Sequence, residues 1–116
     1  MKRKILLILA LVFSSALALS AQEAEPGKQP AWVIDFNNLP ESKRKEFADL
    51  FQDATRMFNQ KRVFECLQTL KKSENIFPDH PQTKNLMGAC FVEFRDFEKA
   101  NSFFERALEL SPGNMS

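Results

Sequence analysis

Residues 78–112, PDHPQTKNLMGACFVEFRDFEKANSFFERALELSP, contain the spacing that decides the fold. Pro78 and Pro112 bound two runs of apolar residues that recur at intervals of three and four, and Arg95-Asp96 separates the runs. Because this interval places side chains on one face of a helix, each run predicts an amphipathic helix. The connection between the runs is short, so we expect the two helices to pack as antiparallel neighbours.

The same pattern occurs 34 residues earlier in the chain. Small and large positions of the later stretch have counterparts of the same kind in the earlier one: Ala54 for Gly88, Met57 for Phe91, Cys66 for Ala100, Leu70 for Phe104, Ser73 for Ala107 and Pro78 for Pro112. Asp53 is the exception, because its counterpart is the apolar Met87. An internal repeat of this period predicts stacked helical hairpins. We therefore predict an all-α fold with two antiparallel hairpins, residues 40–80 and residues 81–114.

Residues 81–114 resemble the tetratricopeptide repeat (TPR). The matching positions are Met87, Gly88, Phe91, Ala100, Phe104, Ala107 and Pro112. Lys84 departs from the pattern, because the family usually has Trp at this position. Small residues let two helices cross closely, aromatic residues fill the space beside the crossing, and proline ends the second helix. The resemblance implies a fragment of an α-solenoid that binds a protein or peptide partner and has neither catalytic residues nor a cofactor.

A structural role is the alternative to partner binding. Repeats of this kind bury their apolar faces against neighbouring repeats, and roughly three are usually needed for stability. Two repeats therefore also suit a module that assembles with itself, or with more of its own chain, and has no external ligand.

The resemblance also places a partner-binding groove along the first helix of each repeat. The family's groove positions correspond to Ala48, Phe51, Thr55, Phe58 and Asn59 in the first repeat and to Gln82, Asn85, Ala89, Val92 and Glu93 in the second. Family members that grip a terminal carboxylate carry Lys and Asn where this chain has Phe51 and Thr55, so we expect an apolar or helical segment as ligand instead. If the apolar arm from Trp32 to Phe36 covers Phe51 and Phe58, no groove is available.

The first 21 residues have the order of charge and hydrophobicity that is typical of a secretory signal peptide. Lys2-Arg3-Lys4 precede the apolar residues 5–13, and small residues dominate from 14 to 21. We expect cleavage after Ala21, and export to the periplasm or the medium. Without cleavage, residues 5–21 could act as an anchor, which would be the one contact with a membrane. In the remaining chain, residues 22–39 read as a polar linker followed by the apolar arm.

Side chains suited to catalysis or metal binding are few. The single histidine, His80, lies in a turn and has no Cys or second His at metal-ligand spacing, so we expect no metal site and no enzyme. The formal net charge is +1, and it becomes −2 when the three basic residues of the signal peptide are removed. A charge so close to zero gives no field that would hold nucleic acid.

Cys66 and Cys90 lie on helices that we expect to be antiparallel neighbours. Each is about twelve residues from the turn near Pro78, so the two side chains should lie at a similar height. A disulfide would stabilise an exported protein by about 3 kcal/mol in the chain-entropy description. The alternative is a pair of free thiols that pack as small apolar side chains.

Overall fold

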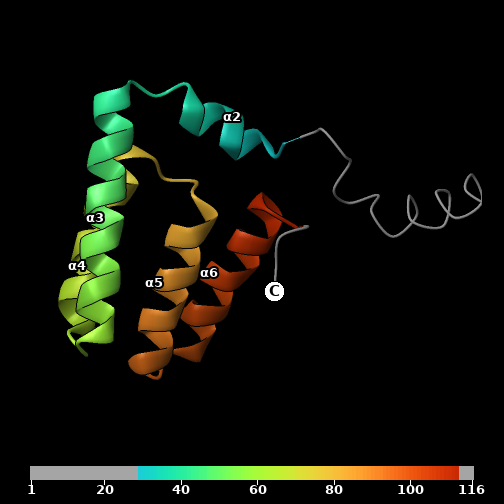
Figure 1. Cartoon of the computed structure of the whole chain (residues 1–116). Coiled ribbons are helices and arrows are strands. Elements are labelled where there is room, and N and C mark those ends of the chain that lie inside the picture. Colours follow the sequence, from blue (N-terminus) through green and yellow to red (C-terminus); the bar gives the residue numbers. More distant parts are fainter. Residues whose placement is uncertain (1–28, 113–116) are drawn as a thin grey trace, which may run out of the picture.

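The computed structural model describes residues 29–112. The predicted signal peptide, residues 22–28 of the linker and residues 113–114 of the second repeat lie outside the described residues. The described chain forms five helices and no strand: α2 Ala31–Asn37, α3 Glu41–Asn59, α4 Val63–Ile76, α5 Pro81–Glu93 and α6 Phe97–Leu110. Helices α3 and α4 form one antiparallel hairpin and α5 and α6 form a second beside it (Figure 1). The predicted all-α fold is confirmed.

The helix boundaries repeat with the period that the sequence indicates. Helix α4 covers residues 63–76 and α6 covers residues 97–110, which is a shift of 34 positions at both ends. The turns before them also correspond, since Lys61 and Arg95 both have positive φ angles, 65° and 62°. Helix α3 is longer than α5 at its N-terminus, where α5 begins at Pro81. Helices α3 to α6 therefore form two consecutive repeats of a helical hairpin.

The two helices of the second hairpin cross closely because residue 88 has no side chain. A Cβ atom on Gly88 would lie 2.5 Å from Cε1 of Phe104, which is closer than two carbon atoms can approach. Ala54, the counterpart in the first hairpin, is fully buried. Small residues at these positions thus set the distance between paired helices.

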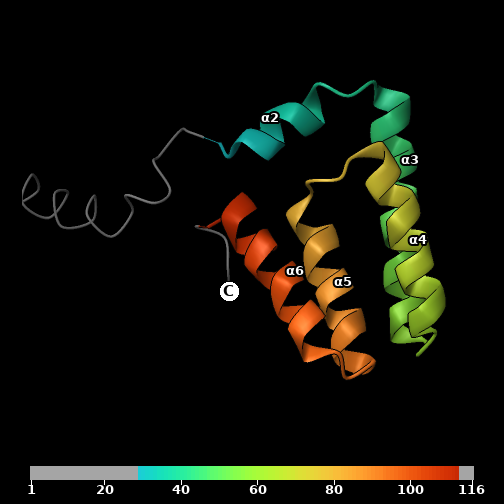
Figure 2. The same cartoon turned by 180° about the vertical axis from the view of Figure 1, so that it is seen from behind.

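The core lies between the two hairpins, where α4 packs against α5 (Figure 2). Its buried members come from both hairpins: Ala54, Cys66, Leu67, Leu70, Met87 and Cys90. Burial of these apolar side chains is the main force that holds the repeats together.

Lys84, which replaces the Trp usual in the family, also joins the hairpins. Its Nζ lies 2.7 Å from Oε2 of Glu74 on α4, and the Lys84 side chain is only 12% exposed. The same Nζ lies 5.8 Å from the ring centroid of Phe103 on α6, within range of a cation–π interaction. The aliphatic stem of Lys84 is therefore buried between the hairpins, and its charge is paired with Glu74.

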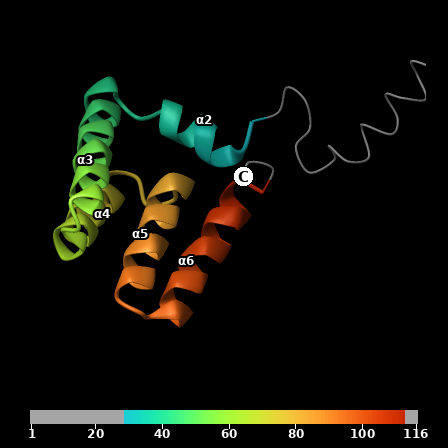
Figure 3. The same cartoon turned by 60° about the horizontal axis from the view of Figure 1, so that its bottom comes forward.

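The arm from residue 31 onward is helical. Helix α2 lies across one end of the array, and its C-terminus leads into the start of α3 while its N-terminus is nearer to the end of α6 (Figure 3). Phe36 of α2 packs edge-to-face on Phe47 of α3 and on Phe77, each at 5.2 Å between ring centroids. Among the helices of residues 29–112, none has the length and hydrophobicity to cross a bilayer.

Candidate functional site

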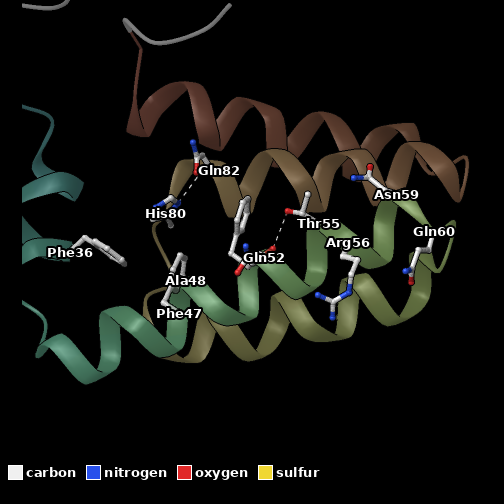
Figure 4. Close-up of a pocket in the computed structure, with 11 residues that line it drawn as sticks. Phe36, Phe47, Ala48, Gln52, Thr55, Arg56, Asn59, Gln60, His80 and Gln82 are labelled. Carbon is white, nitrogen blue, oxygen red and sulfur yellow. Dashed lines mark hydrogen bonds between the residues drawn. The ribbon is translucent and has the colours of Figure 1, made fainter.

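A pocket of about 940 Å³ lies along the exposed face of α3. Figure 4 shows its lining, which comes from α2, α3 and the start of α5. The lining residues are Phe36, Phe47, Ala48, Phe51, Gln52, Thr55, Arg56, Asn59, Gln60, His80 and Gln82. We call this pocket the α3 groove.

One end of the α3 groove is aromatic. Aromatic rings from α2, α3 and the α4–α5 turn surround the imidazole of His80, with centroid distances of 4.7 Å for Trp32, 4.8 Å for Phe47, 5.4 Å for Phe36, 6.3 Å for Phe77 and 6.4 Å for Phe51. We call these five rings and the imidazole the aromatic cluster. Phe36, Phe47, Phe51 and His80 of this cluster line the groove, and of these Phe36 and Phe51 keep part of their surface exposed for contact with a ligand side chain.

His80 is part of the wall of the groove and caps a helix. Its side chain Nδ1 accepts a hydrogen bond from the backbone N–H of Gln82 at 3.3 Å, which satisfies a donor at the start of α5. The residue is 8% exposed, and burial lowers the pKa of the imidazole to about 4. The ring is therefore neutral near pH 7 and packs as an aromatic side chain.

The other end of the α3 groove is lined by amide and hydroxyl groups. Its polar residues are Gln52, Thr55, Asn59 and Gln60, and each is exposed to solvent, whereas Gln82 lies beside His80 at the aromatic end. The Thr55 hydroxyl donates to the carbonyl oxygen of Phe51 at 2.9 Å. Arg56 brings a positive charge, which Asp53 partly balances at 3.0 Å. Side-chain amides can donate to and accept from a peptide backbone, so this end suits an extended chain.

Five of the predicted groove residues line the α3 groove: Ala48, Phe51, Thr55, Asn59 and Gln82. The rest do not. Phe58 lies outside the lining, is half-buried and packs against the core, as Phe51 also does in part. The remaining four lie further along α5 than Gln82 and outside the lining: Asn85, Ala89, Val92 and Glu93.

Sequence reasoning missed six lining residues: Phe36, Phe47, Gln52, Arg56, Gln60 and His80. A signal existed for three of them, because Gln52, Arg56 and Gln60 follow Ala48 at intervals of four on one face of a helix. For His80 no local signal exists, since α2 must fold back across the array to complete its surroundings. The arm does not fill the groove, as the alternative supposed, but borders it through Phe36.

The two cysteines meet in the core away from the groove. Cys66 on α4 and Cys90 on α5 are both fully buried, and their sulfur atoms lie 3.5 Å apart as free thiols. Burial raises the pKa of both thiols, that of Cys90 to about 12. In residues 29–112, no group of three or more His, Cys, Asp or Glu side chains is placed to hold a metal ion.

The chain is similar to the protein CTR9 homolog of Arabidopsis thaliana. The two are 34% identical over 67 residues, which make up 57% of this chain and 6% of the plant protein. No protein-family model matches the chain, and no solved structure matches it significantly. The chain thus spans a small fraction of the length of this relative. Together with the repeated helices, the similarity supports a TPR-like helical scaffold.

Proposed function

We propose that this chain is an exported, non-catalytic scaffold that binds a peptide segment of a partner protein in the α3 groove. The observation that carries the proposal is the division of the groove, which has an aromatic cluster at one end and a row of amides at the other. Pockets of several hundred Å³ with apolar walls and a few polar groups are typical of ligand sites.

The lining suggests the kind of peptide. Phe36 and Phe51, the half-buried rings at the aromatic end, favour a large apolar side chain, which would lose its contact with water there. From Phe51 to Asn59 the helix rises about 12 Å, which is the length of about four residues of extended peptide. The amides along this distance can bond to the peptide backbone without selecting particular side chains. We therefore expect a short extended segment with one large apolar residue near its end.

The environments of His80, Cys66 and Cys90, the residues that could have been catalytic, disfavour a catalytic role. The Nδ1 atom of His80 is engaged by the N–H of Gln82, and the ring is buried. Both thiols are buried and their pKa values are raised, so the thiolate that would act as a nucleophile is scarce. Binding needs none of these groups in a reactive form.

Export is proposed from the sequence alone. The basic, apolar and small-residue segments of residues 2–21 come in the order of a signal peptide. The mass of the mature protein from its native host would test this, because cleavage after Ala21 leaves a chain that starts at Gln22. An intact N-terminus would refute cleavage.

The groove can be tested by selecting binders from a random peptide library displayed on phage. We expect the selected peptides to share a large apolar residue and to lose at least tenfold in affinity for Phe51→Glu. Phe64→Glu is the matched control, because Phe64 is 63% exposed and lies outside the groove, and its affinity should change by less than twofold. Phe51 also packs against the core, so Thr55→Arg serves as a second variant that blocks the groove from an exposed position.

Two results would overturn the proposal. One is unchanged binding in Thr55→Arg, and the other is a dependence of the selected peptides on Phe64. Light scattering on the same samples separates partner binding from self-assembly, the alternative function. Self-assembly would be favoured by Phe97 and Leu108, which are exposed apolar residues of α6, and it predicts a mass above that of a monomer.

A further inference from the structure

The side chains of Cys66 and Cys90 bring two thiols from different hairpins into contact. Cys66 belongs to α4 of the first hairpin and Cys90 to α5 of the second, 24 positions later. Both residues have no exposed surface, and their sulfur atoms are 3.5 Å apart. Sulfur atoms at this distance need only small side-chain movements to bond, provided the Cα atoms are also close enough. Cys66 and Cys90 belong to α4 and α5, which pack directly against each other.

The surroundings of the two thiols favour a stable structural disulfide over one that reductants reach easily. Neighbouring core residues such as Ala54, Leu70 and Met87 are apolar and exclude water from the pair. Burial raises the pKa of Cys66 and Cys90, so neither thiol forms much thiolate while the hairpins are packed together. Oxidation must therefore take place during folding or during a local opening, and the closed core would then shield the product from reductants.

We propose that Cys66 and Cys90 form an intramolecular disulfide that joins the two hairpins, with a dithiol-oxidising disulfide as the oxidant. One thiol loses its proton, and its thiolate attacks a sulfur of the oxidant, which releases one thiolate and leaves a mixed disulfide. The second thiol, also deprotonated, attacks the sulfur of the first cysteine and expels the other half of the oxidant. The protein loses two electrons and two protons, and the oxidant is reduced to two thiols.

The bond acts at the interface on which the shape of the α3 groove depends. Helices α4 and α5 make most of the contact between hairpins, and α3 touches α5 much less. Most residues that line the groove lie between Phe47 and Gln60 in the first hairpin, whereas Gln82 belongs to the second hairpin. A bridge from α4 to α5 therefore holds the two sides of the groove in one relative position. The bond itself does not require that the groove binds a peptide.

The test is refolding of the full chain in a buffer of reduced and oxidised glutathione, followed by alkylation in denaturant and intact-mass measurement. We expect a mass about 2 Da below that of the reduced chain and no alkylated cysteine. The oxidised protein should melt about 10 °C or more above the reduced protein, because the bond closes a long loop in the unfolded chain.

Cys66→Ala is the matched control, since Ala100 occupies the corresponding position of the second repeat. Its melting temperature should not respond to reductant, and Cys90 should carry glutathione or remain alkylatable. Two alkylated cysteines in the refolded native chain would overturn the proposal. Glutathione adducts on both cysteines, or dimers linked by disulfides, would overturn it as well. The native chain alone supplies these outcomes if the variant does not fold.

Discussion

Acidification should destabilise the fold through His80. The imidazole is buried in the aromatic cluster, and burial lowers its pKa from 6.5 to about 4. Because the unfolded chain binds this proton at higher pH than the folded chain, stability is complete above pH 6.5 and falls as the pH decreases towards 4. The neighbouring carboxylate of Asp79 is paired with Arg106 at 3.2 Å, and burial is the cause of the lowered pKa.

The size of the effect follows from the two pKa values. Between pH 7.5 and pH 5 the difference in proton binding should lower the free energy of unfolding by about 2 kcal/mol. That is a large part of the stability of a small domain. Most carboxylates remain ionised at pH 5, so this range separates the histidine from general acid unfolding.

Urea unfolding at several pH values measures this loss. Trp32 is the only tryptophan and its ring centroid lies 4.7 Å from that of His80, so its fluorescence reports on the aromatic cluster while circular dichroism reports on the helices. His80→Asn is the first control, because Asn keeps an N-cap acceptor for α5 but has no proton to bind. His80→Phe is the second, because Phe keeps the aromatic packing. Both variants should lose about 2 kcal/mol less than the native chain on going from pH 7.5 to pH 5.

An NMR pH titration measures the pKa of the His80 imidazole independently, since the chain has a single histidine. A midpoint well below 6 supports the reasoning. A midpoint at 6.5 or above, or equal losses of stability in the native chain and His80→Asn, would refute it. Such a result would mean that the surrounding rings stabilise the imidazolium by cation–π interaction as much as burial disfavours it.

Two further predictions concern the repeat. Gly88→Ala should lower the free energy of unfolding by about 1–2 kcal/mol, because the clash of the new methyl group with Phe104 exceeds the gain in helix propensity. Thermal unfolding would check it, and a stability equal to the native value would show that the ring moves aside freely. At Lys61 and Arg95, where φ is positive, Gly variants should be more stable than Val variants by about 1–2 kcal/mol, because a β-branched residue strains this conformation. Urea denaturation of the two pairs would measure the difference, and equal stabilities would contradict the argument.

The fold could be predicted because its determinants are local and repeated. The 34-residue period from Pro78 to Pro112 reappears in the boundaries of α4 and α6. Small residues such as Gly88 reveal close helix crossings, since only a small residue can occupy one. Fold class and helix positions of this kind depend on spacing along the chain, which the sequence displays directly.

The candidate site depended on contacts between distant segments. The resemblance to the TPR placed Phe51, Thr55 and Asn59 on the groove, but it placed Phe58 there as well, which lies outside the lining. Which of these residues line the groove depends on where the second hairpin packs against the first. That position is a property of the whole array.

The sequence alone determined an all-α chain of two repeats with small residues where paired helices cross, because a helical period and a steric requirement both act within one hairpin. Only the tertiary structure decided that His80, which reads as an ordinary turn residue, would be buried among five aromatic rings. Trp32 and Phe36 reach it from α2, about 45 positions earlier in the chain. No spacing rule connects residues so far apart, since their meeting results from the burial of an apolar arm against the end of the array.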